Sequence, residues 1–134
     1  MYNRRVATEA DIFIQEGRAV DDDNDVWIGT SGWNYDHWRG RFYPEDCTEE
    51  EWFDYYAEHF NTVEINNTFY NLPEQSTFRA WREQCPDRFR YAVKGNQYIT
   101  HMKRLKDAEE PVERFTGRAR KLKDRLGPVL WQLR

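Results

Sequence analysis

The stretch PVERFTGRARKLKDRLGPVLWQL, residues 111–133, predicts a helix that is followed directly by a strand. Apolar residues recur at every third or fourth position up to residue 126, which is the spacing of an amphipathic helix. Gly127 is expected just past the helix, in the left-handed conformation that ends many helices, and Pro128 prevents further helix. Residues 128–133 then read as a strand. The apolar positions of the predicted helix are Val112, Phe115, Ala119, Leu122 and Leu126.

Helices and strands alternate in the same way toward the N-terminus. Short apolar runs predict strands at 26–30, 62–66 and 89–94. Thr48 and Glu51 predict a capping box at the start of one helix, and a second helix is expected at 77–84. Residues 67–76 and 95–107 are expected to be loops. The order β-α-β-α-β-α-β indicates an α/β fold with a parallel sheet of about four strands and three helices.

Alternation of side chains along the strands distinguishes two such architectures. Val63 and Ile65 share one strand face, whereas Glu64 and Asn66 share the other. A doubly wound sheet is covered by helices on both faces, so its strands are apolar throughout. In a (β/α)8 barrel, apolar residues face the helices and polar residues line the top of the lumen. The pattern therefore favours a partial TIM-barrel-like fold.

The length of the chain conflicts with a complete barrel. A barrel takes about 250 residues, whereas residues 26–134 supply only four strands. We expect this domain to be the N-terminal half of a TIM-barrel-like domain, truncated after the fourth strand. Its two open sheet edges predict a partner, either a second copy in a homodimer or a missing C-terminal half. Residues 1–25, which end in the acidic run Asp21 to Asp25, are expected to form a flexible extension.

Composition excludes several classes of protein. Aromatic residues make up 16% of the 134 residues, which argues against disorder. No apolar stretch reaches the roughly 18 residues of a membrane span, and no signal sequence follows Arg4 and Arg5, so a cytoplasmic protein is expected.

The charged residues are distributed unevenly. Residues 71–134 hold 15 basic and 8 acidic residues, whereas residues 1–70 hold 5 basic and 16 acidic residues. The basic C-terminal half makes nucleic-acid binding an alternative function, although charge alone does not establish it.

Several ordered motifs resemble the YecE-like family (domain of unknown function 72). They are GTSGW at 29–33, WRG at 38–40, FYP at 42–44, VEINNTFY at 63–70, ITH at 99–101 and LGP at 126–128. The resemblance covers residues 26–133 and implies a TIM-barrel-like fold, but no established activity. The chain departs from the family pattern at Asn67 and Gly95, and family members are about twice as long as this domain.

Glu64 and Lys94 are the first candidates for chemistry. Both are expected at the C-terminal ends of adjacent strands, pointing inward, where barrel enzymes hold their sites. Glu64 suits a general base, and Lys94 suits an anionic group or a Schiff base. The alternative is a structural ion pair without chemistry, because buried charges need partners.

His101, in the loop after the third strand, is a further candidate for acid–base catalysis. No metal-ligand spacing accompanies it, so no metal site is predicted, and no cofactor is identified. Aromatic and amide side chains near the strand ends are candidates for ligand binding, although the aromatic ones could equally form a loop core. The ligand-binding candidates are Trp33, Asn66, Tyr70 and Gln132.

Three functions follow from these residues. The first is a barrel enzyme acting on a small polar or phosphorylated ligand. The second is a nucleic-acid-binding module that uses the basic half and the loop aromatics. The third is a truncated remnant without independent activity, which would unfold without cooperativity.

Overall fold

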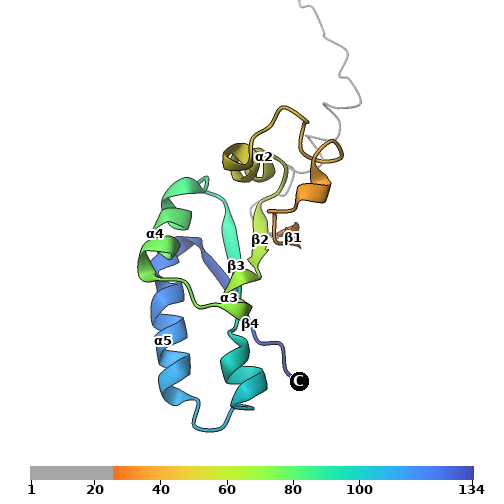
Figure 1. Cartoon of the computed structure of the whole chain (residues 1–134). Coiled ribbons are helices and arrows are strands. Elements are labelled where there is room, and N and C mark those ends of the chain that lie inside the picture. The colour runs from red at the N-terminus through yellow and green to blue at the C-terminus, as the bar shows by residue number, and fades with distance from the viewer. Residues whose placement is uncertain (1–25) are drawn as a thin grey trace, which may run out of the picture.

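A sheet of four parallel strands organises residues 26–134, the part of the chain that the computed structural model describes. The strands are β1 (Gly29–Ser31), β2 (Thr62–Ile65), β3 (Arg90–Lys94) and β4 (Leu126–Leu130), and they lie in the order β1-β2-β3-β4 (Figure 1). The acidic extension expected at 1–25 lies outside the described residues. The predicted α/β fold with a parallel sheet is confirmed, and the sheet is not closed.

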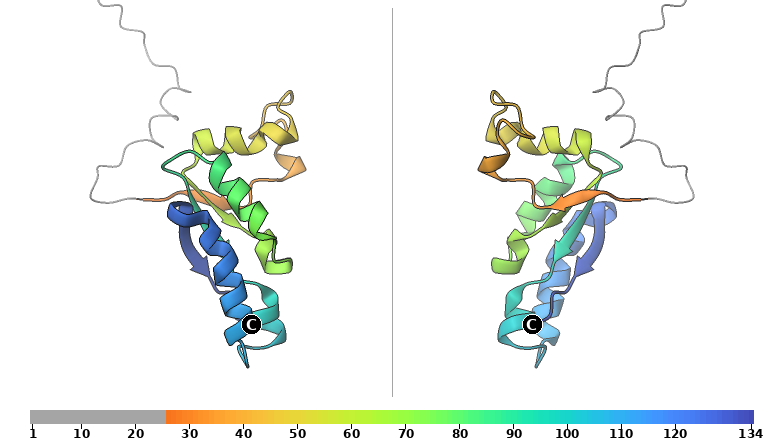
Figure 2. Two further views of the ribbon diagram at one scale, coloured as in Figure 1. Left: turned by 90° about the vertical axis from the view of Figure 1, so that its left-hand side faces the viewer. Right: turned by 90° about the vertical axis from the view of Figure 1, so that its right-hand side faces the viewer.

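Three longer helices lie together on one side of this sheet. They are α2 (Trp52–His59), α4 (Gln75–Gln84) and α5 (Glu109–Ala119), and they connect successive strands. Figure 2 shows the helices in front of the strands from one side and the bare strands from the other. The sheet therefore has one covered face and one open face. No helix within residues 26–134 combines the length and apolar character needed to cross a membrane.

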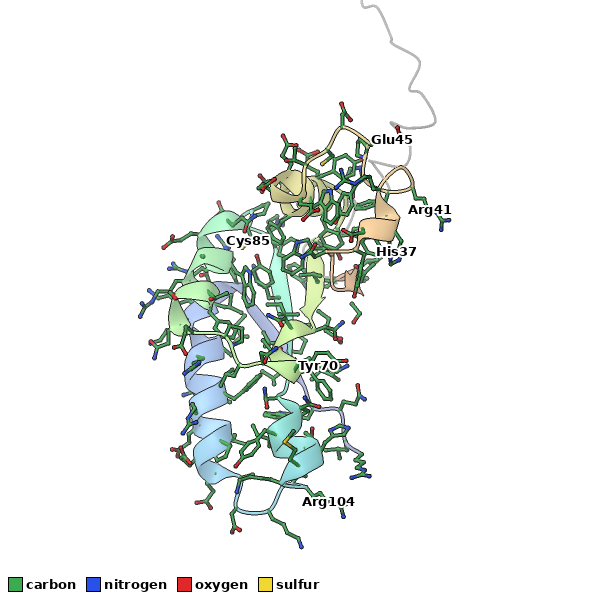
Figure 3. The ribbon with its side chains drawn as sticks, in the orientation of Figure 1. His37, Arg41, Glu45, Tyr70, Cys85 and Arg104 are labelled. Carbon is green, nitrogen blue, oxygen red and sulfur yellow. The ribbon has the colours of Figure 1, made fainter. Side chains whose placement is uncertain are left out.

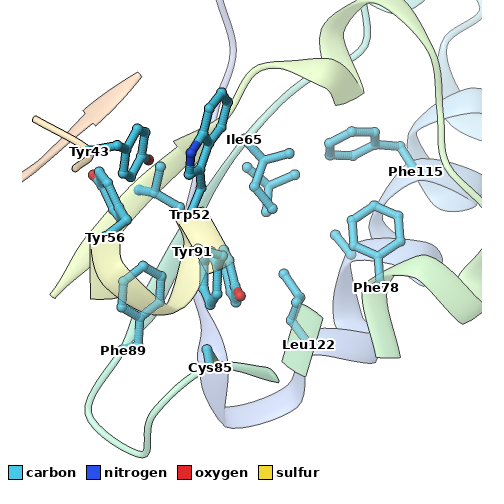
Figure 4. Packing of buried hydrophobic residues seen from close by; sticks show 14 of the residues in the cluster. Tyr43, Trp52, Tyr56, Ile65, Phe78, Cys85, Phe89, Tyr91, Phe115 and Leu122 are labelled. Carbon is cyan, nitrogen blue, oxygen red and sulfur yellow. The ribbon is translucent and has the colours of Figure 1, made fainter. Parts of the chain in front are cut away.

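The core lies between the sheet and these helices (Figure 4). Val63, Ile65, Tyr91 and Val93 are at most 1% exposed, so the predicted apolar strand face is confirmed. Aromatic rings fill most of the space between the layers, and several meet edge to face, an arrangement that adds stability beyond burial. The helices and their connections contribute Trp52, Phe53, Tyr56, Phe78, Phe89 and Phe115.

The hydroxyl of Tyr56 joins α2 to two strands at once. It accepts a hydrogen bond from the backbone N–H of Thr30 at 2.8 Å and donates one to the carbonyl oxygen of Thr62 at 2.9 Å. Tyr56 is fully buried, and this burial raises the pKa of its hydroxyl. The side chain thus links α2 to backbone groups of β1 and β2.

The predicted capping interaction before α2 is present. The carboxylate of Glu51 accepts hydrogen bonds from the backbone N–H of Thr48 at 2.8 Å and from its hydroxyl at 2.9 Å. The Thr48 N–H holds the pKa of Glu51 below its usual value. A short 3-10 turn, Glu49–Glu51, precedes the α-helix itself.

The first strand differs from its prediction. It spans Gly29–Ser31 instead of 26–30, and the three apolar residues before it are exposed, not buried. The segment is held at the edge of the sheet by Asn61, whose side chain bonds the backbone of Val26 and Ile28, and the Arg90 guanidinium lies 5.2 Å from the centroid of the Trp27 ring. These exposed residues are Val26, Trp27 and Ile28.

The end of the third helix also differs from its prediction. The α-helix stops at Ala119 and continues as a 3-10 helix, Arg120–Arg125, in which Lys123 adopts a positive φ of 51°. Gly127 is not the residue after the helix but belongs to β4, which begins at Leu126 and ends at Leu130. The tighter helix allows Leu122 to remain fully buried in the core.

Two segments predicted as loops contain short helices. The α3 helix (Asn67–Tyr70) follows β2, and a π-helix, Tyr98–Met102, follows β3. Both are too short to show a periodic apolar pattern, which explains why the sequence did not reveal them. Both lie at the carboxyl end of the sheet.

Candidate functional site

The open face of the sheet brings polar residues from three strands to its carboxyl end. Side chains on this face alternate with the buried ones, and Ser31 of β1 is paired in register with Glu64 of β2, which is paired with Ala92 of β3. Lys94 lies two residues further along β3 on the same face. Strand ends of this kind hold the ligand sites of parallel α/β folds.

Glu64 is held by neighbouring polar groups. The hydroxyl of Ser31 donates a hydrogen bond to Oε1 of Glu64 at 2.9 Å. The side-chain amide of Asn66 in turn donates a hydrogen bond to the hydroxyl oxygen of Ser31. The hydroxyl of Tyr35 donates to the carbonyl oxygen of Ser31 at 2.5 Å. The structure therefore brings together the predicted residues Glu64 and Asn66, with Ser31 as a link that the sequence reasoning missed.

Lys94 occupies a different environment. Its Nζ lies 5.0 Å from the centroid of the Phe69 ring, a cation–π contact. Within residues 26–134, its ammonium group has no ion pair and no hydrogen bond. The side chain is partly buried, so its positive charge faces the open side of the sheet without a protein anion to balance it.

The alternative interpretation, a structural ion pair between Glu64 and Lys94, is not found among residues 26–134. Glu64 is opposite Ala92, so Lys94 is displaced by one strand sideways and two residues along. That offset corresponds to about 4.8 Å across the sheet and about 6.6 Å along it. The two residues are thus diagonal neighbours on the open face, a separation that long side chains can span, so the register alone does not keep their charges apart.

His101 joins the same end of the sheet through Phe69. Its ring meets the ring of Phe69 edge to face, with centroids 5.2 Å apart, and its Nδ1 lies 2.8 Å from the hydroxyl of Thr100. Phe69 therefore lies beside both Lys94 and His101 and sets the spacing between them. This position of Phe69 could not be predicted from the sequence, because it depends on tertiary contacts with residues of β3 and of the π-helix.

A buried threonine fixes the backbone beneath these side chains. The hydroxyl of Thr68 donates to the carbonyl oxygens of Lys94, at 2.6 Å, and Ile65, at 2.9 Å. The side chain of Asn96 donates to the carbonyl oxygen of Thr68 at 2.9 Å. The ends of β2 and β3 are thus tied to α3, and Phe69 is held in place.

The other predicted ligand-binding residues are more scattered. Trp33 is partly buried, and its ring meets that of Phe53 edge to face at 5.2 Å, so it packs against the core. Tyr70 is 65% exposed and contacts Phe69; Figure 3 shows it on the open side, near the carboxyl end of the strands. Gln132 follows β4 and is exposed.

Cys47 lies apart from the strand ends and is poorly suited to nucleophilic chemistry. It borders a hollow of about 410 Å³ whose other lining residues include Asp46 and Glu51. Desolvation, followed by these two carboxylates, raises the pKa of the thiol. A reactive cysteine needs the opposite shift. Among residues 26–134, no three His, Cys, Asp or Glu side chains are grouped closely enough to hold a metal ion.

Comparisons with known proteins agree with this architecture. The chain is 34% identical over 108 residues to the UPF0759 protein YecE of Escherichia coli K12, a match that covers 81% of this chain and 37% of that protein. It is 29% identical over 75 residues to the UPF0759 protein YunF of Bacillus subtilis, which covers 56% of this chain and 26% of the relative.

A solved structure is similar as well. The crystal structure of a DUF72 family protein from Thermotoga maritima matches with a TM-score of 0.70 and 32% identity, over 81% of this chain and 44% of that one. The chain thus spans less than half the length of these relatives. The family of proteins of unknown function called DUF72 matches residues 27–134. This chain therefore belongs to the DUF72 family.

Proposed function

We propose that the carboxyl end of the sheet binds a small anionic ligand, such as a phosphorylated metabolite, and transfers a proton on it. Lys94 binds the anionic group, Glu64 is the general base, and His101 supplies or removes a second proton. The observation that carries the proposal is Lys94 itself: a partly buried cation at a strand end, without an anion within residues 26–134.

The energetics of Lys94 support an external anion. The Lys94 side chain is partly buried, and its ammonium group lies 5.0 Å from the centroid of the Phe69 ring, a cation–π contact. A phosphate or carboxylate would add a charge-assisted hydrogen bond, which contributes about 1.5–3 kcal/mol. Binding of an anion to the Lys94 ammonium group should therefore be favourable.

Glu64 is suited to proton transfer because its position is fixed. Ser31 donates to one carboxylate oxygen, Oε1, which orients the group while the other oxygen remains available. A positioned carboxylate that reaches a substrate proton contributes about 10²–10⁴-fold to a rate.

The nucleic-acid alternative receives less support. It requires aromatic rings that are free to stack on bases, but Trp33 and Trp38 are partly buried and pack against the core. The basic side chains Arg118 and Arg125 are engaged in ion pairs with Glu74 and Asp87.

We place the proposed activity in the cytoplasm, which is consistent with the free thiols of Cys47 and Cys85.

Calorimetric titration with inorganic phosphate and pyrophosphate tests the binding step. We expect Lys94→Met to weaken binding by about tenfold or more, which corresponds to about 1.4 kcal/mol. Lys103→Met is the matched control, since Lys103 is also partly buried and its Nζ lies 5.8 Å from the centroid of the Tyr98 ring. Equal loss of binding in both variants, or no binding to the native chain, would contradict the proposal.

Deuterium exchange tests the proton transfer separately. Small phosphorylated aldehydes and ketones are incubated with the chain in D2O, and exchange of their carbon-bound protons is followed by proton NMR. Glu64→Gln keeps the shape of the side chain and its hydrogen bond from Ser31, so we expect exchange to cease while binding persists. Exchange that continues in Glu64→Gln would exclude Glu64 as the base.

A further inference from the structure

We propose that a second pocket, formed where the connections before and after β3 meet α5, binds an uncharged saccharide. The pocket has a volume of about 420 Å³, a size typical of small-molecule sites. It is lined by α3 and the segment after it, by the π-helix and by the first half of α5, which Figure 1 shows next to one another. Glu64, Lys94 and His101 do not line it, so the proposal goes beyond the proposed function.

The walls of this pocket come from the interior of the described range. Its lining residues lie between Tyr70 and Phe115, in two consecutive connections of the chain. None of them belongs to β1, to β4 or to the residues after β4. The pocket therefore does not arise from the edges of the sheet or from its open face.

Buried apolar side chains form the base of the pocket. Ile99 of the π-helix and Phe115 of α5 are 2% and 0% exposed and belong to the core, and Leu72 and Pro111 are partly buried. Core packing fixes the positions of the two buried side chains. A ligand that enters the pocket must present an apolar surface to them, because a polar group buried there would lack a hydrogen-bond partner.

Two exposed tyrosines lie at the rim of the pocket. Tyr70 of α3 is 65% exposed, and Tyr98 of the π-helix is 47% exposed. Neither hydroxyl has a hydrogen-bond partner among residues 26–134. Each tyrosine thus offers an aromatic ring to an apolar face of a ligand and a hydroxyl to a polar group.

The other polar groups of the lining are uncharged or neutralise one another. The side-chain amide of Asn71 is exposed and has no hydrogen bond within the described part of the chain. Arg114 forms an ion pair with Glu110, one turn earlier in α5. The side chain of Asn96 is already bonded to two backbone groups, one in α3 and one in the π-helix. The pocket therefore offers donors and acceptors without a net charge, which favours an uncharged ligand over a phosphate.

A pyranose ring combines the two properties that this lining requires. Its faces carry C–H groups that pack against aromatic and aliphatic side chains, while the hydroxyls around its edge donate and accept hydrogen bonds. A flat aromatic ligand would also cover the apolar base, but its edge would supply fewer partners for Asn71 and the two tyrosine hydroxyls. The lining therefore favours a saccharide.

NMR titration of the isotope-labelled chain tests the site. The probes are the methyl glycosides of glucose, galactose, mannose and N-acetylglucosamine, together with benzamide as a flat aromatic compound. We expect at least one glycoside to shift the backbone amides of Asn71, Tyr98, Ile99 and Arg114. Binding of none of the glycosides, or of benzamide alone, would overturn the proposal.

Substitutions at the rim test whether the glycoside occupies this pocket. Tyr70→Ala and Tyr98→Ala should each weaken binding by about tenfold, through loss of the ring contact. Met102→Ala is the matched control, because Met102 lies on the same π-helix, is 66% exposed and does not line the pocket. Unchanged affinity in both tyrosine variants, or an equal loss in Met102→Ala, would contradict the proposal.

Competition with inorganic phosphate separates this proposal from the proposed function. Lys94 does not line the pocket, so we expect the glycoside affinity to stay the same when phosphate is present in excess. Displacement of the glycoside by phosphate would mean that it binds at the strand ends and would overturn the second site. If phosphate does not bind the chain at all, the proposed function fails while the glycoside titration still decides this proposal.

Discussion

The two faces of the sheet differ in how their side chains are satisfied. On the covered face, Val63, Ile65, Tyr91 and Val93 are buried among aromatic rings, and the polar atoms of the tyrosines find backbone partners. On the open face, Glu64 is hydrogen-bonded to Ser31 at one oxygen, and the ammonium group of Lys94 has, among residues 26–134, the Phe69 ring as its partner. The covered face is therefore closely packed, whereas the polar side chains of the open face have fewer partners among residues 26–134.

We expect this difference to separate stability from the proposed function within one set of strands. Alternation along β2 and β3 places the candidate residues Glu64 and Lys94 next to buried residues that belong to the core. Substitutions on the covered face should therefore change the free energy of unfolding, and those on the open face should change ligand binding. The predictions below test that separation, beginning with the largest effect.

Phe78→Ala should destabilise the chain most. Phe78 of α4 is fully buried between the helices and the sheet, and its removal leaves a cavity in the core. We expect the free energy of unfolding, measured by urea denaturation, to fall by about 3–5 kcal/mol. Leu105→Ala, at an exposed position, is the control and should change it by less than about 0.5 kcal/mol. Equal effects would mean that the core does not determine stability.

Tyr56→Phe should have an intermediate effect. It removes the hydroxyl that links the N–H of Thr30 to the carbonyl oxygen of Thr62, and it leaves both backbone groups without that partner. We expect a loss of about 1–3 kcal/mol in the same urea measurement. A neutral result would show that water replaces the hydroxyl between β1 and β2.

Alkaline pH should also weaken the covered face. Burial raises the pKa values of Tyr43, Tyr56 and Tyr91 above their ordinary value of 10.0. The folded state keeps these hydroxyls protonated, while the unfolded chain ionises them. Stability is therefore fully present below pH 10.0 and should be lost as pH rises above it, toward the pKa values of the folded state.

Urea denaturation at several pH values between 8 and about 12 measures this loss. Tyr35→Phe serves as the control. Tyr35 is only partly buried and is not one of the core tyrosines, so this variant should show the same loss of unfolding free energy with pH as the native chain. A free energy of unfolding that stays constant through this range would contradict the assignment of the three tyrosines to the core.

Glu64→Gln and Lys94→Met should have the smallest effect on stability. Both residues lie on the open face. Within the described part of the chain, the Glu64 carboxylate accepts a hydrogen bond from Ser31, and the Lys94 ammonium group makes a cation–π contact with Phe69. We expect changes within about 0.5 kcal/mol, the usual range for surface substitutions. A large loss from either variant would indicate a structural role for that residue and would remove the distinction between the two faces.

The sequence predicted the larger features of the fold because they rest on periodic patterns. The apolar alternation of Val63 and Ile65, the Thr48–Glu51 cap and the helical repeat of Val112 and Phe115 all correspond to observed elements. Features without a period escaped detection. The α3 helix and the π-helix each depend on local geometry, and the end of α5 depends on how Leu122 enters the core.

The candidate site shows a similar limit. The placement of Glu64 and Lys94 on one face followed from alternation, but their separation depends on register, which the sequence does not reveal. The links through Ser31 and Phe69 depend on contacts between residues up to 35 positions apart. Residue type identified the candidates, and only the three-dimensional arrangement grouped them.

The most direct test of the separation between the two faces is an NMR titration of the isotope-labelled chain with inorganic phosphate. We predict that chemical-shift changes concentrate on the amides of Ser31, Glu64, Asn66, Lys94 and His101, and that Lys94→Met removes them. Changes that concentrate instead on the covered side, around the basic residues of α5 and of the 3-10 helix at Arg120–Arg125, would contradict the account. So would changes at the strand ends that persist unaltered in Lys94→Met.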